Sequence, residues 1–123
     1  MPVKARLLDI RCLIFQLSDR METIGPLTET LRWGEPAYLT QTSKSGTTIR
    51  LGRTRSAPQD AAIFFNCQTS LVGEFRMQFA DEFRFDKNRA VIIPHERPLP
   101  ENAVRFCLCR ALRYHLRCGP SFG

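Results

Sequence analysis

Residues 83–93 read Phe-Arg-Phe-Asp-Lys-Asn-Arg-Ala-Val-Ile-Ile, and this stretch decides the class of fold. Two predicted strands, 83–86 and 89–93, flank the pair Lys87-Asn88. Asparagine tolerates the positive φ that a tight turn requires, so the pair is typical of a hairpin turn. The stretch therefore predicts a β-hairpin, and with it an antiparallel sheet.

Two further strands are predicted before this hairpin. Residues 47–53 alternate, with Ile49 and Leu51 on one face and Arg50 on the other, which indicates a half-buried strand. Residues 61–66 contain Ile-Phe-Phe and indicate a more fully buried strand. The turn before the first of these strands is Ser-Lys-Ser-Gly at 43–46.

Helical patterns surround the strands. Residues 3–20 predict an amphipathic helix whose apolar positions recur at three- and four-residue spacing: Leu7, Ile10, Ile14, Leu17 and Met21. Residues 26–33 predict a short helix, with Pro26 at its first position and Gly34 and Pro36 as its stop.

Two more helices follow later in the chain. One begins after Thr69 or Ser70, whose hydroxyl can cap it, and stacks Leu71, Phe75 and Phe79 on one face. The last runs from Pro100 to about Arg117, with an apolar face of Val104, Leu108 and Ala111 and with Phe106 or Leu112 beside them.

These elements predict one domain over residues 1–123, with a core of about 5–117. Its length suits one domain, and 43% apolar residues can bury a core without disulfides. Paired strands with covering helices predict an α+β fold: an antiparallel sheet of about four to five strands with helices packed on one face.

The cysteines and the apolar runs bear on the compartment. Five cysteines are an odd number, and no signal-peptide pattern or run of roughly 20 apolar residues is present. The sequence predicts a cytoplasmic protein with reduced thiols that does not span a membrane.

Residues 29–38, Glu-Thr-Leu-Arg-Trp-Gly-Glu-Pro-Ala-Tyr, resemble the signature of the YdhG-like bacterial domains of unknown function. That signature is a short helix ending in Trp-Gly-x-Pro and a small-aromatic pair. Weaker matches are the segments 48–52, 66–69, 88–89 and 98–100, so the resemblance covers roughly residues 5–117. It implies an α/β sandwich likened to the frataxin fold. One relative is described as a frataxin-like iron chaperone, and most members have no settled activity.

Iron binding is therefore an alternative function, although the expected cofactor is none. Frataxin-type iron sites use an acidic first helix, whereas this one is mainly basic. The acidic residues that remain as an alternative iron site are Glu74, Asp81 and Glu82. Cys107 and Cys109 lie two apart in a predicted helix and point apart, so they cannot share an ion. His95 and His115 have no His or Cys at ligand spacing.

No catalytic motif is present, so the chain is expected not to be an enzyme. An enzyme built on Cys67 is a weaker alternative, because a helix N-terminus just after this residue would favour its thiolate form.

The net charge of +6 suggests nucleic-acid binding as another interpretation. The arginines are not interleaved with exposed aromatic residues as base stacking requires, so the sequence argues against nucleic acid.

The most suggestive constellation is polar and aromatic. Trp33 and Tyr38 bracket Glu35 at an expected helix-to-strand junction, and other polar groups stand at element ends. An aromatic pair with an arginine suits an anionic or planar ligand. A structural role is the alternative, in which Trp33 fills the core and Gly34 caps a helix. The predicted function is a non-enzymatic binding domain for a small molecule or protein partner, with a homodimer left open. Its candidate residues are Trp33, Glu35, Tyr38, Arg50, Asn66, Cys67, Thr69 and Arg89.

Overall fold

The computed structural model describes residues 3–32, 34–40 and 43–115 and has an α+β fold, as predicted. Three helices accompany six strands: α1(Val3–Arg20), β1(Thr28–Arg32), β2(Glu35–Leu39), β3(Ile49–Gly52), β4(Ala61–Phe64), α2(Leu71–Gln78), β5(Arg84–Asp86), β6(Ala90–Ile93) and α3(Glu101–Leu112). All strand pairs are antiparallel, and the strand order is β1-β2-β3-β4-β6-β5.

The prediction of a helix over residues 26–33 is wrong, because Thr28–Arg32 form β1 and pair with β2 from Thr28↔Leu39 to Arg32↔Glu35. Gly34 has a φ of 79° and lets the chain reverse between the two strands, so it closes a hairpin and does not stop a helix. Thr28 and Thr30 are β-branched and fit a pleated strand. The hairpin adds two strands to the four that the sequence located, so the sheet has six strands and not the expected four to five.

The predicted β5–β6 hairpin is confirmed, with one difference in its turn. Lys87, and not Asn88, takes the positive φ, at 52°. The predicted strands over residues 47–53 and 61–66 are likewise confirmed as β3 and β4. Ser70 takes the N-cap position of α2 but makes no capping hydrogen bond through its side chain.

The last helix ends at Leu112, earlier than predicted, because a loop takes over its terminal carbonyl groups. The Thr47 amide donates to the Ala111 carbonyl at 2.9 Å, and the Ser45 hydroxyl donates to the Leu112 carbonyl at 2.8 Å. Gly46 lies between them, and a Cβ there would overlap both carbonyl oxygens. Arg117 lies outside the described residues.

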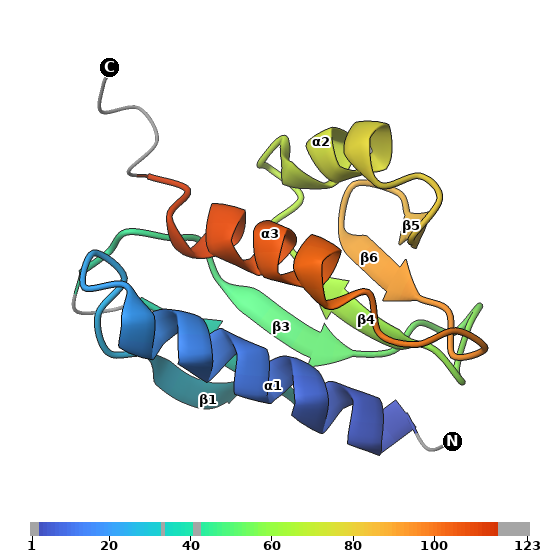
Figure 1. Ribbon diagram of the computed structural model, residues 1–123, viewed down its shortest axis with the longest axis horizontal. Coiled ribbons are helices and arrows are strands. Elements are labelled where there is room, and N and C mark those ends of the chain that lie inside the picture. The colour runs from blue at the N-terminus through green and yellow to red at the C-terminus, as the bar shows by residue number, and fades with distance from the viewer. Residues whose placement is uncertain (1–2, 33, 41–42, 116–123) are drawn as a thin grey trace.

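The helices pack on one face of the sheet, as predicted. Figure 1 shows α1 and α3 side by side over the strands, with α2 next to α3 and β6. Ile10, Ile14 and Leu108 are fully buried against strand residues such as Ile63, and Leu7, Leu17 and Met21 border that core. None of the helices in the described part of the chain is long and apolar enough to cross a membrane.

The opposite face of the sheet carries no helix in the described part of the chain, and we call it the open face. Only a small apolar cluster lies there, formed by Ala62, Phe64, Ala90 and Ile92 with Ala57 packed against it. The two faces therefore differ in kind, and the open face has room for charged side chains.

Candidate functional site

The open face presents two rows of side chains across the strands. The register Ala37↔Arg50, Arg50↔Phe64 and Phe64↔Ala90 aligns one row, because directly opposed residues share a face. Gly52, Ala62 and Ile92 align in the second row. Glycine and alanine leave the backbone close to the surface, so that long arginine side chains can lie across it.

Phe64 forms the floor of this face. The Cζ atoms of Arg50 and Arg89 lie 5.0 Å and 6.0 Å from the centroid of its ring. Both guanidinium groups are thus attracted by the face of the ring, which orients them. Phe64 itself is only 6% exposed.

Each of these two arginines also has a carboxylate partner. Arg50 Nη1 lies 2.8 Å from Glu35 Oε1, and Arg89 Nη2 lies 3.0 Å from Asp86 Oδ2. Glu35 reaches Arg50 by lying directly over Gly52, where any Cβ would overlap the carboxylate. The pairs therefore hold the arginines in place on the open face.

Two adjoining grooves meet at Phe64. One has a volume of about 400 Å³ and a lining that includes Arg32, Arg50, Phe64, Asn66, Cys67 and Arg89. The other, of about 410 Å³, shares Arg50, Phe64 and Arg89 and extends to Arg53, Arg55 and Ser56. Ligand pockets in proteins start at roughly 300 Å³, so either groove can hold a small molecule.

The grooves are strongly basic. Five arginines line them against the carboxylates of Glu35 and Asp86. Within the described residues, Arg32, Arg53 and Arg55 have no carboxylate at ion-pair distance. The surplus of positive charge favours an anion on this face.

The structure brings together five of the eight residues that the sequence singled out: Glu35, Arg50, Asn66, Cys67 and Arg89. Thr69 lines neither groove, and its hydroxyl donates to the Asn66 carbonyl at 2.7 Å, which fixes the turn before α2. Trp33 lies outside the described residues. Sequence reasoning missed Phe64, because its run of apolar neighbours indicated only a buried strand.

Tyr38 does not belong to the open face, since it is 1% exposed beneath α1. Its hydroxyl donates to Glu29 Oε2 at 2.8 Å, and Arg11 binds both oxygens of that carboxylate, at 2.6 Å and 2.9 Å. The hydrogen bonds from Arg11, helped by Tyr38, lower the pKa of Glu29 to about 2. Burial, with the bond to Glu29, raises the pKa of Tyr38. This Arg11–Glu29–Tyr38 network ties α1 to the first hairpin and has a structural role.

The cysteines differ in their surroundings. Cys67 is exposed at the edge of the first groove, whereas Cys107 is buried in α3, where burial raises the pKa of its thiol. The His95 ring pairs with Asp60, and the His115 amide donates to the Ser45 carbonyl. Among the described residues that line the groove at Cys67 there is no histidine or carboxylate, so the groove supplies no general base to that thiol.

The structure also brings together a group of metal-ligand type that the sequence did not reveal. Asp60, His95 and Glu96 have ligand atoms within 4.8 Å of one another, and they are the sole such trio among residues 3–32, 34–40 and 43–115. Glu74, Asp81 and Glu82, the residues of the predicted alternative iron site, form no such group there. Instead, Glu74 pairs with Arg110.

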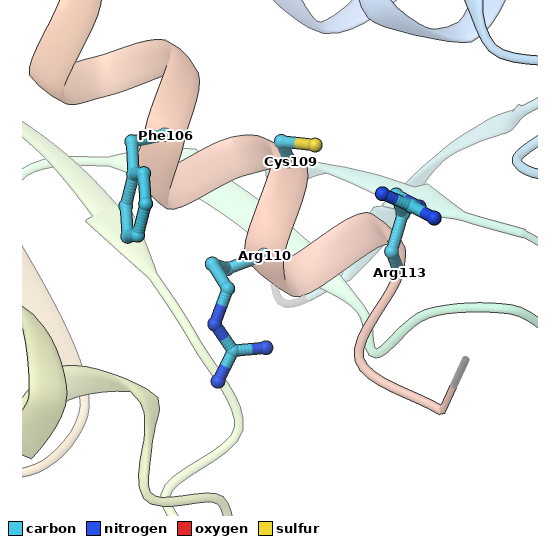
Figure 2. A pocket seen from close by; sticks show the side chains of 4 residues that line it. All are labelled: Phe106, Cys109, Arg110 and Arg113. Carbon is cyan, nitrogen blue, oxygen red and sulfur yellow. The ribbon is translucent and has the colours of Figure 1, made fainter. Parts of the chain in front are cut away.

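A smaller pocket of about 270 Å³ lies beside α3 and is lined by Phe106, Cys109, Arg110 and Arg113. Figure 2 shows Phe106 and Arg110 projecting to one side of the helix, with Cys109 turned away from them. Arg110 is engaged by Glu74, and Cys109 Sγ lies 3.8 Å from Met21 Sδ. With one of its two arginines already paired, this pocket offers an anion less charge than the open face does.

Comparisons with protein-family models, with curated proteins and with solved structures gave no match to this chain. The YdhG-like resemblance and the frataxin-like fold therefore stay predictions, and the functional argument depends on the geometry of the open face.

Proposed function

We propose that this chain is a non-enzymatic binding domain that holds a small, planar anion on the open face of its sheet. The observation that carries the proposal is the pair of guanidinium groups, from Arg50 and Arg89, held over the ring of Phe64 beside a groove of about 400 Å³.

Charge and shape both support an anionic ligand of limited size. Guanidinium groups recognise carboxylate and phosphate through paired hydrogen bonds, and their flat faces stack on planar groups. The amide of Asn66 stands in the same groove and can add a hydrogen bond. A protein partner would need a wider surface, and stable protein interfaces bury roughly 800 Å² on each side.

The proposal also covers the cellular location and the family of the chain. Exposed thiols such as Cys12 and Cys67 persist in a reducing compartment, which supports a cytoplasmic location. Membership of the YdhG-like family, with its frataxin-like fold and bacterial origin, would agree with a binding domain. No contact among the described residues favours iron at Glu74, Asp81 and Glu82, so the iron chaperone stays a weaker alternative.

The proposal is tested by isothermal titration with two planar anions, AMP and salicylate, and with adenosine as the uncharged match to AMP. We expect at least one of the two anions to bind. For AMP, we expect adenosine to bind about tenfold more weakly or worse, since charged hydrogen bonds are worth about 1.5–3 kcal/mol each. The double variant Arg50→Gln, Arg89→Gln should lower the affinity for the bound anion by about tenfold or more.

The matched control is Arg105→Gln on α3, which removes an arginine that is also paired with a glutamate but lies away from the grooves. It should leave binding unchanged. Binding of neither anion, or equal losses in the double variant and the control, would overturn the proposal. Single-stranded DNA that binds far more tightly than AMP through the same arginines would replace it with a nucleic-acid surface.

A further inference from the structure

The ends of β4 and β6 bring Asp60, His95 and Glu96 together. Asp60 directly precedes β4, and His95 and Glu96 follow β6 after Pro94. The two strands are antiparallel, with Ala61 opposite Ile93, so the end of β6 returns to the start of β4. This register explains why residues 35 positions apart meet, and why sequence spacing gave no sign of it.

The ligand atoms are almost in place for one cation. His95 Nδ1 lies 2.6 Å from Asp60 Oδ1 and 3.9 Å from Glu96 Oε1. Zinc–nitrogen and zinc–oxygen bonds of about 2.0–2.2 Å place neighbouring ligand atoms roughly 3.4 Å apart in a tetrahedral site. One distance is shorter than this and the other longer, so a small rotation of the exposed His95 ring would admit an ion.

Asp60 is positioned before any ion arrives. Its side chain is 5% exposed, and its Oδ1 accepts the His95 backbone N–H at 2.8 Å as well as the contact with the ring. Burial raises the pKa of this carboxyl, but the hydrogen bonds with His95 outweigh burial and hold the pKa below its usual value. Oδ1 is the atom in contact with the imidazole, and Arg84 Nη1 stands 3.9 Å from the other oxygen, Oδ2. The backbone N–H would remain as an outer-shell support for the bound carboxylate.

We propose that Asp60, His95 and Glu96 bind one divalent transition-metal ion of the zinc class. The imidazole and two carboxylates suit zinc and also accept manganese. Asp60 is the buried anchor, and the exposed His95 and Glu96 form the mouth through which the ion enters. Three protein ligands leave a coordination position for water. The site is independent of the anion proposed for the open face.

The test uses Mn²⁺ as the probe, followed by electron paramagnetic resonance of the free ion, with Zn²⁺ added as a competitor. Manganese prefers oxygen and nitrogen, so the exposed thiols of Cys12 and Cys67 do not compete for it. We expect one Mn²⁺ per chain, displaced by Zn²⁺. Glu96→Gln and His95→Gln should each weaken binding by about tenfold or more, because even outer-shell changes cost a metal site about 10–100-fold.

The matched controls are His115→Gln and Glu101→Gln, which change the second histidine and an exposed glutamate at the start of α3. Both should leave Mn²⁺ binding unchanged. Glu96 is exposed, so its variant tests the site without disturbing the Asp60–His95 contact. The proposal is overturned if Mn²⁺ does not bind stoichiometrically, or if the site and control variants weaken Mn²⁺ binding equally. Asp60 and His95 would then form only a hydrogen bond that links the two strands.

Discussion

On β4, Ile63 and Phe64 are neighbours that face opposite sides of the sheet. Ile63 is fully buried beneath the helices, whereas Phe64 lies beneath two arginines on the open face. The covered face is filled with aliphatic and aromatic side chains, and the open face combines small residues with charged ones. The contrast indicates that one side of the strand carries most of the stability and the other carries the proposed binding, so substitutions should separate the two.

The largest expected effect comes from the covered face. Ile63→Ala should lower the free energy of unfolding by about 2–5 kcal/mol, because it leaves a cavity in a packed core. The measurement is urea denaturation. Affinity for the planar anion, measured on the folded protein, should stay unchanged.

Phe64→Leu is the matching change on the open face and should show the reverse pattern. It should cost less stability than Ile63→Ala while weakening anion binding, since it removes the ring that orients Arg50 and Arg89. If Phe64→Leu proves the more destabilising of the two and leaves binding intact, the division between the faces is wrong.

A second prediction concerns the loop that closes α3. Gly46→Ala should cost about 1–3 kcal/mol of stability, because the new methyl group would overlap the carbonyl groups of Ala111 and Leu112. Gly73→Ala within α2 is the control, since nothing lies within 4 Å of the added carbon. By helix propensity it should be neutral or stabilise by up to about 1 kcal/mol. Equal losses in thermal unfolding for both variants would contradict the close approach at Gly46.

A third prediction uses acid to probe the Arg11–Glu29–Tyr38 network. The pKa of Glu29 is about 2 in the folded protein, below its ordinary value of 4.5. A lowered folded-state pKa stabilises the fold above the ordinary value, and that contribution is lost as the pH falls from about 4.5 towards 2. Unfolding by urea across this window should show stability falling less steeply in Glu29→Gln than in the unchanged protein. Parallel curves would mean that the network contributes nothing.

The smallest effect on stability is expected at Arg89, one of the two arginines proposed to bind the anion. Arg89→Gln removes an exposed ion pair with Asp86, and such pairs contribute about 0–1 kcal/mol. Its melting temperature should therefore stay close to that of the unchanged protein while the affinity for the planar anion falls. A large drop in melting temperature would identify Arg89 as a structural residue.

Much of the fold could be predicted from the sequence, because local patterns of apolar and turn residues indicate most of its helices and strands. Apolar spacing marked α1, and the flanking strands with their turn marked the β5–β6 hairpin. The first hairpin was missed because Pro26 and Gly34 are also typical of the start and the end of a helix. Only the pairing of Thr28 with Leu39 and of Arg32 with Glu35 distinguishes the two structures.

The candidate site was predicted in part, for a similar reason. Glu35 stood out at the expected helix-to-strand junction, Arg50 on the polar face of a predicted strand and Arg89 at an element end, and the sheet gathers them on one face. Tyr38 went to the other face because the alternation of β2 reverses the side at each residue. The Asp60–His95–Glu96 group depends on the register between β4 and β6, which no local pattern in the sequence reports.

The most direct test of the account is a titration of the ¹⁵N-labelled protein with whichever of AMP and salicylate binds in the calorimetric experiment, followed by NMR chemical shifts. The account predicts perturbations centred on the open face and its edge, at Arg50, Phe64, Asn66, Cys67 and Arg89, with little change in α1. Perturbations centred on α3, around Phe106 and Arg113, would place the ligand beside the helix and contradict the claim that the open face binds it.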